Sequence, residues 1–385
     1  MSTAKPLYGN LIAAIATVAA CDMALGLTLQ LIPLIQHARG TPAWLIGLVA
    51  AMGPLGILLA GPLLPQLIKK SSAKLVAYMA IIGILCGLFG FAFSAWLPLW
   101  FALRFMMGVA IATLFTVSEI WIISFTNDQN RGRIMGLYIS ALAMSFALGP
   151  LIIPFTGIEG WKPWIIAMVC IAAGSLPLTF VNVASHVDER SHGFFGAFRR
   201  APFLFAAICA ATLFDSVFIS FFTIFAIAKG VPLATSSVML GFGIIGSALL
   251  FYPMGWLGDH WSRGKVVLCN AAITVLCSAL LASFITTGLA WPLVLLLFAT
   301  AAGVYVVCLA VMGDIFKGAD LVAGSAAVSA MWGVGGLVGP PLAGVAIDTF
   351  GINAMPYTLT IIYAALLIAL LFNGGKLTQT QKEIA

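Results

Sequence analysis

The sequence predicts an all-α membrane protein with twelve transmembrane helices, arranged as two pseudo-symmetric six-helix bundles. Three observations support this fold class. The 385 residues are 62% hydrophobic and only 8% charged, whereas a soluble domain carries about 25% charged residues. Breaks at polar, proline or glycine clusters divide the chain into twelve apolar runs, each about as long as a bilayer-spanning helix. Short motifs also recur at nearly the same offset in the two halves.

The apolar runs define the expected helices and domains. Six runs precede a polar linker at 184–201 and six follow it, which predicts an N-terminal bundle at 1–183 and a C-terminal bundle at 202–385. The expected helices are Tyr8–Ile32, Trp44–Leu64, Leu75–Phe93, Pro98–Ser124, Ile134–Phe155, Pro163–Val183, Pro202–Ala228, Ser236–Leu257, Val266–Ile285, Pro292–Met312, Leu321–Ile347 and Ala354–Phe372.

The basic residues predict the orientation, because cytoplasmic loops of membrane proteins are enriched in lysine and arginine. With a cytoplasmic N-terminus, fourteen Lys and Arg residues lie inside, three lie outside, and Arg104 lies within a helix. We therefore expect both termini in the cytoplasm and the chain in the inner membrane. Basic residues that bind nucleic acid cluster on one face, whereas here they occupy short gaps between apolar runs, so no nucleic-acid partner is expected.

Repeated segments indicate that the two halves arose by duplication. "ARGTP" (Ala38–Pro42) recurs as "AKGVP" (Ala228–Pro232), and "LGPLI" (Leu148–Ile152) recurs as "VGPPL" (Val338–Leu342), both 190 residues later. Asp22 matches Asp215 at an offset of 193 residues, each near the middle of the first helix of its half. Since each copy has an even number of helices, the copies are expected to have parallel topology about an axis along the membrane normal.

The loop after the second helix of each half carries a family resemblance. Gly255–Lys265 reads GWLGDHWSRGK and resembles the G-x-x-x-D-R-x-G-R-R motif of the major facilitator superfamily, with His260 in place of the usual arginine. The first copy begins at Gly61, but Pro65 and Gln66 replace the Asp-Arg pair. Arg104 and the Gly149-Pro150 pair also resemble helix motifs of that family, the latter those of its drug/proton antiporters. The resemblance covers essentially the whole chain.

This resemblance implies roles for two groups of residues. The motif aspartate of the family helps to latch the cytoplasmic side shut, so the latch of the first half is in doubt. The expected latch residues are Gly255, Asp259, Arg263, Lys265, Arg131 and Arg133. Glycines beside prolines let helices pack closely and bend, and the expected hinge residues are Gly149, Pro150, Gly339 and Pro340.

Only four charged residues lie inside the expected helices: Asp22, Arg104, Glu119 and Asp215. Charges inside a bilayer are costly and usually functional. Asp22 and Asp215 are too short to reach water from mid-depth. Glu119 lies about five residues from a helix end, roughly 7–8 Å deep, so it either lines a cavity or reaches the cytoplasmic surface.

Depth predicts an ion pair for proton coupling. At 1.5 Å per residue, Asp22 and Arg104 each lie about 9 Å below the outer face of a core about 30 Å thick. The resemblance places their helices side by side around a cavity. We therefore expect Asp22 to pair with Arg104 until a proton arrives and releases the arginine. Asp215 is expected to be the carboxylate on the substrate side, or a competitor for Arg104.

The sequence predicts a secondary transporter rather than an enzyme, because it lacks zinc-protease, nucleophile-elbow and phosphate-loop motifs. The preferred function is proton-coupled efflux of a lipophilic or amphiphilic solute by alternating access. Proton-coupled uptake of a small organic metabolite is the alternative. No cofactor or metal is expected, and the chain is expected to be a monomer. The expected substrate-cavity residues are Asp215, Glu119, Gln30, Thr116, Tyr138, Tyr252, Asn270 and Trp332.

Overall fold

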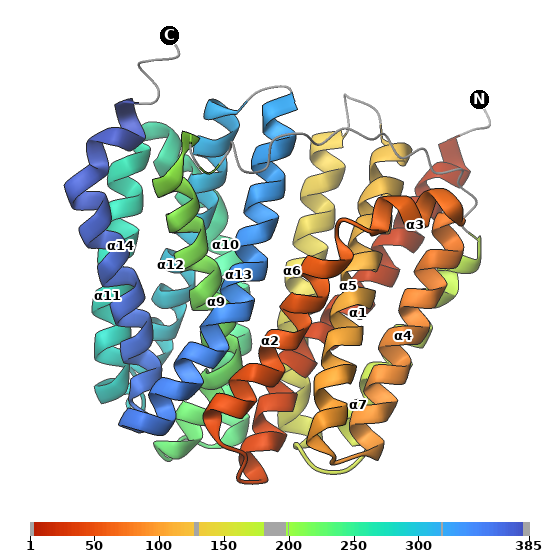
Figure 1. The fold of residues 1–385 in the computed structure, drawn as a ribbon, viewed down its shortest axis with the longest axis horizontal. Helices are drawn as coiled ribbons and strands as arrows, with labels where there is room; N and C mark the ends of the chain where they lie inside the picture. Colours follow the sequence, from red (N-terminus) through yellow and green to blue (C-terminus); the bar gives the residue numbers. More distant parts are fainter. Residues whose placement is uncertain (1–3, 127–130, 181–197, 199, 317–318, 380–385) are drawn as a thin grey trace. The chain divides into compact units, whose positions relative to one another are not determined.

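The computed structural model describes residues 4–126, 131–180, 198, 200–316 and 319–379. Within these ranges twelve helices are long and apolar enough to cross a membrane, so the predicted number of spans is confirmed (Figure 1). The helices are α1 (Ala4–Ala38), α2 (Ala43–Ala60), α3 (Leu64–Lys70), α4 (Ala73–Phe93), α5 (Leu97–Phe125), α6 (Arg131–Thr156), α7 (Lys162–Ser175), η1 (Leu176–Phe180), α9 (Pro202–Ala228), α10 (Leu233–His260), α11 (Arg263–Phe284), α12 (Ala290–Ile315), α13 (Ala319–Phe350) and α14 (Ala354–Gln379).

The chain forms two compact units. The first contains Met1–Ile35 and Met52–Glu189, and the second contains Gln36–Ala51 and Arg190–Ala385. The turn between α1 and α2 and the first half of α2 therefore belong to the second unit. Most of the linker expected at 184–201 falls outside the described residues.

The same helix pairs pack against each other in both units. In the first unit α4 packs against α5, and in the second unit their counterparts α11 and α12 do the same (Figure 1). Helix α1 contacts α6 at Gly26 and Gly149, and its counterpart α9 contacts α13 at Gly335 and Gly339. Helix α9 also packs against α10, α12 and α14. This shared pairing is the pseudo-symmetry that the sequence repeats predict.

The repeated "ARGTP" and "AKGVP" segments form the same turn. Gly40 and Gly230 have positive φ angles of 75° and 92°, a backbone conformation that glycine adopts without the Cβ clash of other residues. The Gly40 amide donates a hydrogen bond to the His37 carbonyl, and the Gly230 amide donates one to the Ile227 carbonyl, each at 2.9 Å. The duplication is therefore visible in backbone geometry as well as in sequence.

The loop after the second helix differs between the halves. Helix α2 ends at Ala60, and the short helix α3 begins at Leu64. Helix α10 instead continues through Gly255 to His260. Gly61-Pro62 explains the break, because proline disfavours helical conformation in the preceding residue and cannot donate a backbone hydrogen bond. The sequence did not predict α3.

Helix α14 continues to Gln379, seven residues beyond the expected end at Phe372. Two further expected helix ends lie near prolines and also need correction. Helix α1 was expected to end at Ile32 but continues through Pro33 to Ala38. Helix α7 ends at Ser175 and is followed by a 3-10 turn that contains Pro177, where an uninterrupted helix to Val183 was expected. In both places a proline lies near the end of a span, and only the second one stops the α-helix.

Candidate functional site

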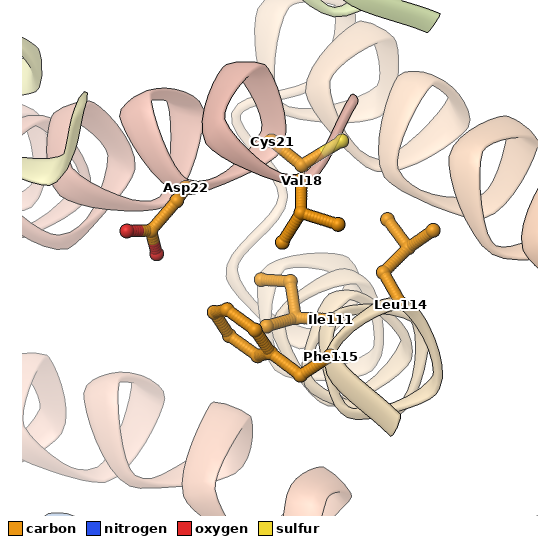
Figure 2. Close-up of a pocket in the computed structure, with 6 residues that line it drawn as sticks. All are labelled: Val18, Cys21, Asp22, Ile111, Leu114 and Phe115. Carbon is orange, nitrogen blue, oxygen red and sulfur yellow. The ribbon is translucent and has the colours of Figure 1, made fainter. Parts of the chain in front are cut away.

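Asp22 lies at mid-span in α1 and is 7% exposed. Val18, Cys21 and Asp22 lie on the same side of α1, since residues three and four apart are neighbours on a helix surface. This side meets α5 at Ile111, Leu114 and Phe115 around a cavity of about 10 Å³, which is close to the space needed by one water molecule. Figure 2 shows the Asp22 carboxyl projecting from α1 beside these apolar side chains.

Arg104 does not pair with Asp22. It is 3% exposed, and its guanidinium packs against Gly53 of α2, where an added Cβ would lie 3.3 Å from Nε. Within the described residues no salt bridge joins Arg104 to Asp22, so the expectation that they form an ion pair is wrong for this structure.

The missing pair has a geometric explanation. Asp22 packs beside Ile111 and Phe115, which lie two to three turns beyond Arg104 along α5.

A hydroxyl chain lies near Asp22 and Glu119. Ser118 of α5 donates to the Phe115 carbonyl at 2.8 Å, and the Ser118 and Tyr138 hydroxyls are 2.8 Å apart. Since Ser118 uses its proton for the carbonyl, Tyr138 of α6 is the donor between the two hydroxyls. The Tyr138 hydroxyl lies within electrostatic range of both Asp22 and Glu119. Tyr138 is buried and Glu119 is exposed.

Asp215 lies at mid-span in α9, next to polar contacts with α13. Thr212 donates to the Met331 carbonyl and Ser216 donates to the Gly335 carbonyl, each at 2.9 Å. A Cβ at Gly335 would overlap Thr212, so glycine is what allows this close approach. The two hydrogen bonds flank Asp215 along the chain and fix its helix against α13.

Two tyrosine hydroxyls interact electrostatically with Asp215. The Trp332 indole N–H of α13 donates to the Tyr305 hydroxyl of α12 at 3.1 Å, and the two rings meet edge to face with centroids 5.8 Å apart. The hydroxyls of Tyr305 and of Tyr363 in α14 lie within electrostatic range of Asp215. The Tyr363 ring is fully buried and packs edge to face on Phe214.

The remaining residues expected in the cavity are divided between the two units. Gln30 is buried in α1, and Thr116 donates to the Ala112 carbonyl of its own helix. Asn270 is buried in α11 against Gly303 of α12. Tyr252 of α10 is 82% exposed. The Tyr138 hydroxyl lies within electrostatic range of Asp22, and Trp332 donates to Tyr305, whose hydroxyl lies within electrostatic range of Asp215.

The expected latch residues are described only in part. Arg263 forms a salt bridge with Asp314 at the end of α12, and Lys265 is exposed. Gly255 lies within α10 with open space around it. The side chains of Asp259, Arg131 and Arg133 lie outside the described part of the structure. The sequence reasoning missed Asp314, although an acidic residue at a helix end opposite a basic motif was a usable signal.

The expected hinge residues lie inside continuous helices. Helix α6 runs through Gly149 and Pro150, and α13 runs through Gly339 and Pro340. A Cβ at Gly149 would overlap the backbone amide of Leu27 in α1. The close helix packing expected of these glycines is therefore present, and bending at the prolines stays a prediction.

Asp348 is a further polar residue that the sequence reasoning missed. Its carboxylate accepts hydrogen bonds from the backbone amides of Ala43 at 3.0 Å and Trp44 at 2.8 Å. These amides lie in the first turn of α2, where backbone N–H groups have no acceptor within their own helix. A carboxylate at this position also interacts favourably with the helix dipole. The end of α13 thus caps the start of α2, and Gly344 allows close approach to Ala43.

A family model supplies the identification. The model described as Major Facilitator Superfamily matches residues 12–304 and 204–384. The chain belongs to this superfamily. It is 24% identical over 360 residues to the MFS-type transporter YfkF of Bacillus subtilis, covering 91% of this chain and 92% of YfkF. It is also 24% identical over 369 residues to the MFS-type transporter YcaD of Salmonella enteritidis, covering 94% of both chains.

Solved structures support the same fold. The nucleoside transporter NupG superposes with a TM-score of 0.79 at 15% identity, covering 94% of this chain and 98% of NupG. A bacterial homologue of the lysosomal transporter Spinster gives a TM-score of 0.76 at 13% identity, covering 99% of this chain and 98% of that one. The superfamily member described here is a multi-pass membrane protein and a secondary transporter of small molecules.

Proposed function

We propose that the protein couples proton entry to the efflux of a lipophilic or amphiphilic solute by alternating access. It does so as a monomer in the inner membrane, with both termini in the cytoplasm. The observation that carries this proposal is the burial of Asp22 among apolar side chains at mid-span. A charge at that position is costly, and ionisable residues inside membrane spans commonly belong to ion pathways.

The proposed coupling uses the two protonation states of Asp22. A protonated carboxyl fits beside Val18 and Phe115 without a counter-charge, whereas a carboxylate there needs water or a cation. Loss of the proton therefore favours a conformation that admits water to Asp22. A proton that binds one conformation better than the other biases the equilibrium between them, and this is the condition for coupling.

The test uses purified protein in proteoliposomes that contain a pH-sensitive dye. A panel of lipophilic compounds is screened for those that dissipate an imposed pH gradient only when the protein is present. Asp22→Asn should abolish this solute-dependent proton flux, and the matched control Glu159→Gln, an exposed carboxylate in the same unit, should keep it. Uphill solute movement by Asp22→Asn on a proton gradient would show that Asp22 is not the coupling residue.

Vesicle orientation separates efflux from the alternative, uptake of a small organic metabolite. Efflux predicts proton-driven accumulation in inside-out vesicles, whereas uptake predicts accumulation in right-side-out vesicles. The topology has its own test: a reporter fused after Ala385 that is active only in the periplasm should stay silent. A strong periplasmic signal would overturn the orientation derived from the basic residues.

A further inference from the structure

An apolar groove lies between α4 and α7 in the first unit, where the two helices pack side by side (Figure 1). Its volume is about 510 Å³. Three lining residues come from each helix: Leu85, Cys86, Phe89, Met168, Val169 and Ala172. All six belong to helices that are long and apolar enough to span the membrane. Since the bilayer core contains no water to cover this surface, lipid is what meets the groove.

The groove continues along α7 as one exposed helix face. The exposed residues of this face are spaced three or four apart, so they are neighbours on the helix surface. They are Lys162, Ile165, Ile166, Val169 and Ala172. The opposite face is buried and includes Trp164, whose ring stacks on Phe91 of α4 with centroids 5.7 Å apart. The exposed face is therefore apolar along its length and carries a cation at its first residue.

Aromatic side chains mark the end of the groove at which α7 begins. Trp161 lies against Phe89 with ring centroids 5.6 Å apart, and Phe89 stacks on Phe93. Tryptophan is enriched at the level of the lipid headgroups. Lys162 follows Trp161 and lies about 9 Å along the helix axis from Met168 in the groove. This spacing suits a single lipid molecule, because half of the hydrocarbon core is about 15 Å thick.

The matching surface of the second half is closed. Two residues of α4 recur in α11 at an offset of 191 residues, where Lys74 and Cys86 match Lys265 and Cys277. Cys86 is exposed in the groove, whereas Cys277 is buried. The next residue, Ser278, lies 2.9 Å from the Thr360 hydroxyl of α14, and α14 packs against more of α11 than α7 does of α4. The groove is therefore a feature of the first half rather than a consequence of the repeated fold.

We propose that the groove binds one acyl chain of an anionic phospholipid, and that Lys162 binds the phosphate of the same molecule. Charge complementarity selects this occupant, because a lysine near the membrane surface attracts anionic headgroups and an ammonium group binds phosphate well. An uncharged amphiphile would gain only the apolar contact. Glu159 is also exposed but precedes the helix, outside the face that continues into the groove. The proposal concerns lipid binding and does not depend on proton coupling.

Photolabelling of the full-length protein in lipid nanodiscs tests the proposal. The probes are phosphatidylglycerol and phosphatidylcholine with the same diazirine at the middle of one acyl chain, and mass spectrometry quantifies the labelled peptides. We expect phosphatidylglycerol to label segments 85–89 and 168–172 about fivefold more than phosphatidylcholine does. The segment around Cys277, which is buried, is the internal reference and should show little labelling by either lipid.

Four variants separate charge from shape. Lys162→Gln should lower phosphatidylglycerol labelling of the groove to the phosphatidylcholine level, and Lys162→Arg should keep the preference. Lys70→Gln removes an exposed lysine of α3 in the same unit and should change groove labelling less than twofold. Ala172→Trp places a large side chain in the groove and should lower labelling by both lipids.

Equal labelling of the groove by the two lipids, or unchanged labelling in Lys162→Gln, would overturn the proposal. An uncharged alkyl glucoside that carries the same diazirine provides the test of a different occupant. If it labels the groove as strongly as phosphatidylglycerol, the groove takes amphiphilic solutes without regard to charge and the proposal fails. If Glu159→Gln lowers labelling as much as Lys162→Gln, the shape of the turn rather than the lysine charge is responsible, and the proposal fails as well.

Discussion

Asp22 and Asp215 occupy matching positions in the two halves of the chain, but their neighbours differ. Asp22 packs against aliphatic and aromatic side chains of α5 around a cavity the size of one water molecule. Asp215 lies within electrostatic range of the Tyr305 hydroxyl, which accepts a hydrogen bond from the substantially exposed Trp332. Two carboxyls at matching positions of the repeat therefore have different surroundings. We infer that the first serves the proton and the second serves the solute.

The latch motif should show the largest difference between the halves. Helix α10 carries the motif aspartate on an unbroken helix, whereas α2 ends before Pro65 and Gln66. Asp259→Asn should impair transport about 5- to 150-fold, as expected for loss of about 1–3 kcal/mol of conformational bias. Gln66→Ala should be mild. The check is the initial transport rate in proteoliposomes at equal protein content, and equal effects of the two variants would contradict the asymmetry.

The glycine contacts between helices also differ between the two halves. A Cβ at Gly149 meets only backbone atoms of α1, whereas a Cβ at Gly339 first meets the Ser216 hydroxyl, which can rotate. Gly149→Ala should therefore destabilise the protein by on the order of 2 kcal/mol, as overpacking does, and Gly339→Ala should cost less. Thermal unfolding in detergent measures both. Gly136→Ala, with open space around it, is the control and should not lower the melting temperature.

The smallest expected effects concern two buried tyrosines. Tyr138 shares a hydrogen bond with Ser118, so Tyr138→Phe should weaken coupling roughly fivefold, corresponding to about 1 kcal/mol for one hydrogen bond. The Tyr363 hydroxyl is buried without a hydrogen-bond partner among the described residues. Tyr363→Phe should therefore leave thermal stability unchanged or raise it, because an unsatisfied buried hydroxyl is costly. A lower melting temperature for Tyr363→Phe would contradict the expectation for that hydroxyl, and normal coupling in Tyr138→Phe would contradict the role given to Tyr138.

The sequence predicted the number of membrane spans, the duplication and the two mid-span carboxyls. Bilayer thickness explains the first success, since each span needs about 20 apolar residues and such runs are visible in the chain. The repeated turn at Gly40 and Gly230 was also predictable, because the positive φ angle restricts the residue type at that position. These features depend on short stretches of sequence or on the solvent, and no knowledge of packing is needed to find them.

Only the tertiary structure decided which side chains meet. The expected pair of Asp22 with Arg104 relied on depths counted from Tyr8 and Pro98, but packing places Asp22 beside Ile111 and Phe115 of α5. Likewise, no local pattern shows that Asp348 caps α2 or that Trp332 donates to Tyr305. The physical reason is that membrane helices are apolar on nearly every face, so hydrophobic periodicity does not reveal which face packs inward. Polar contacts between distant helices are fixed by how close the backbones approach, which packing alone determines.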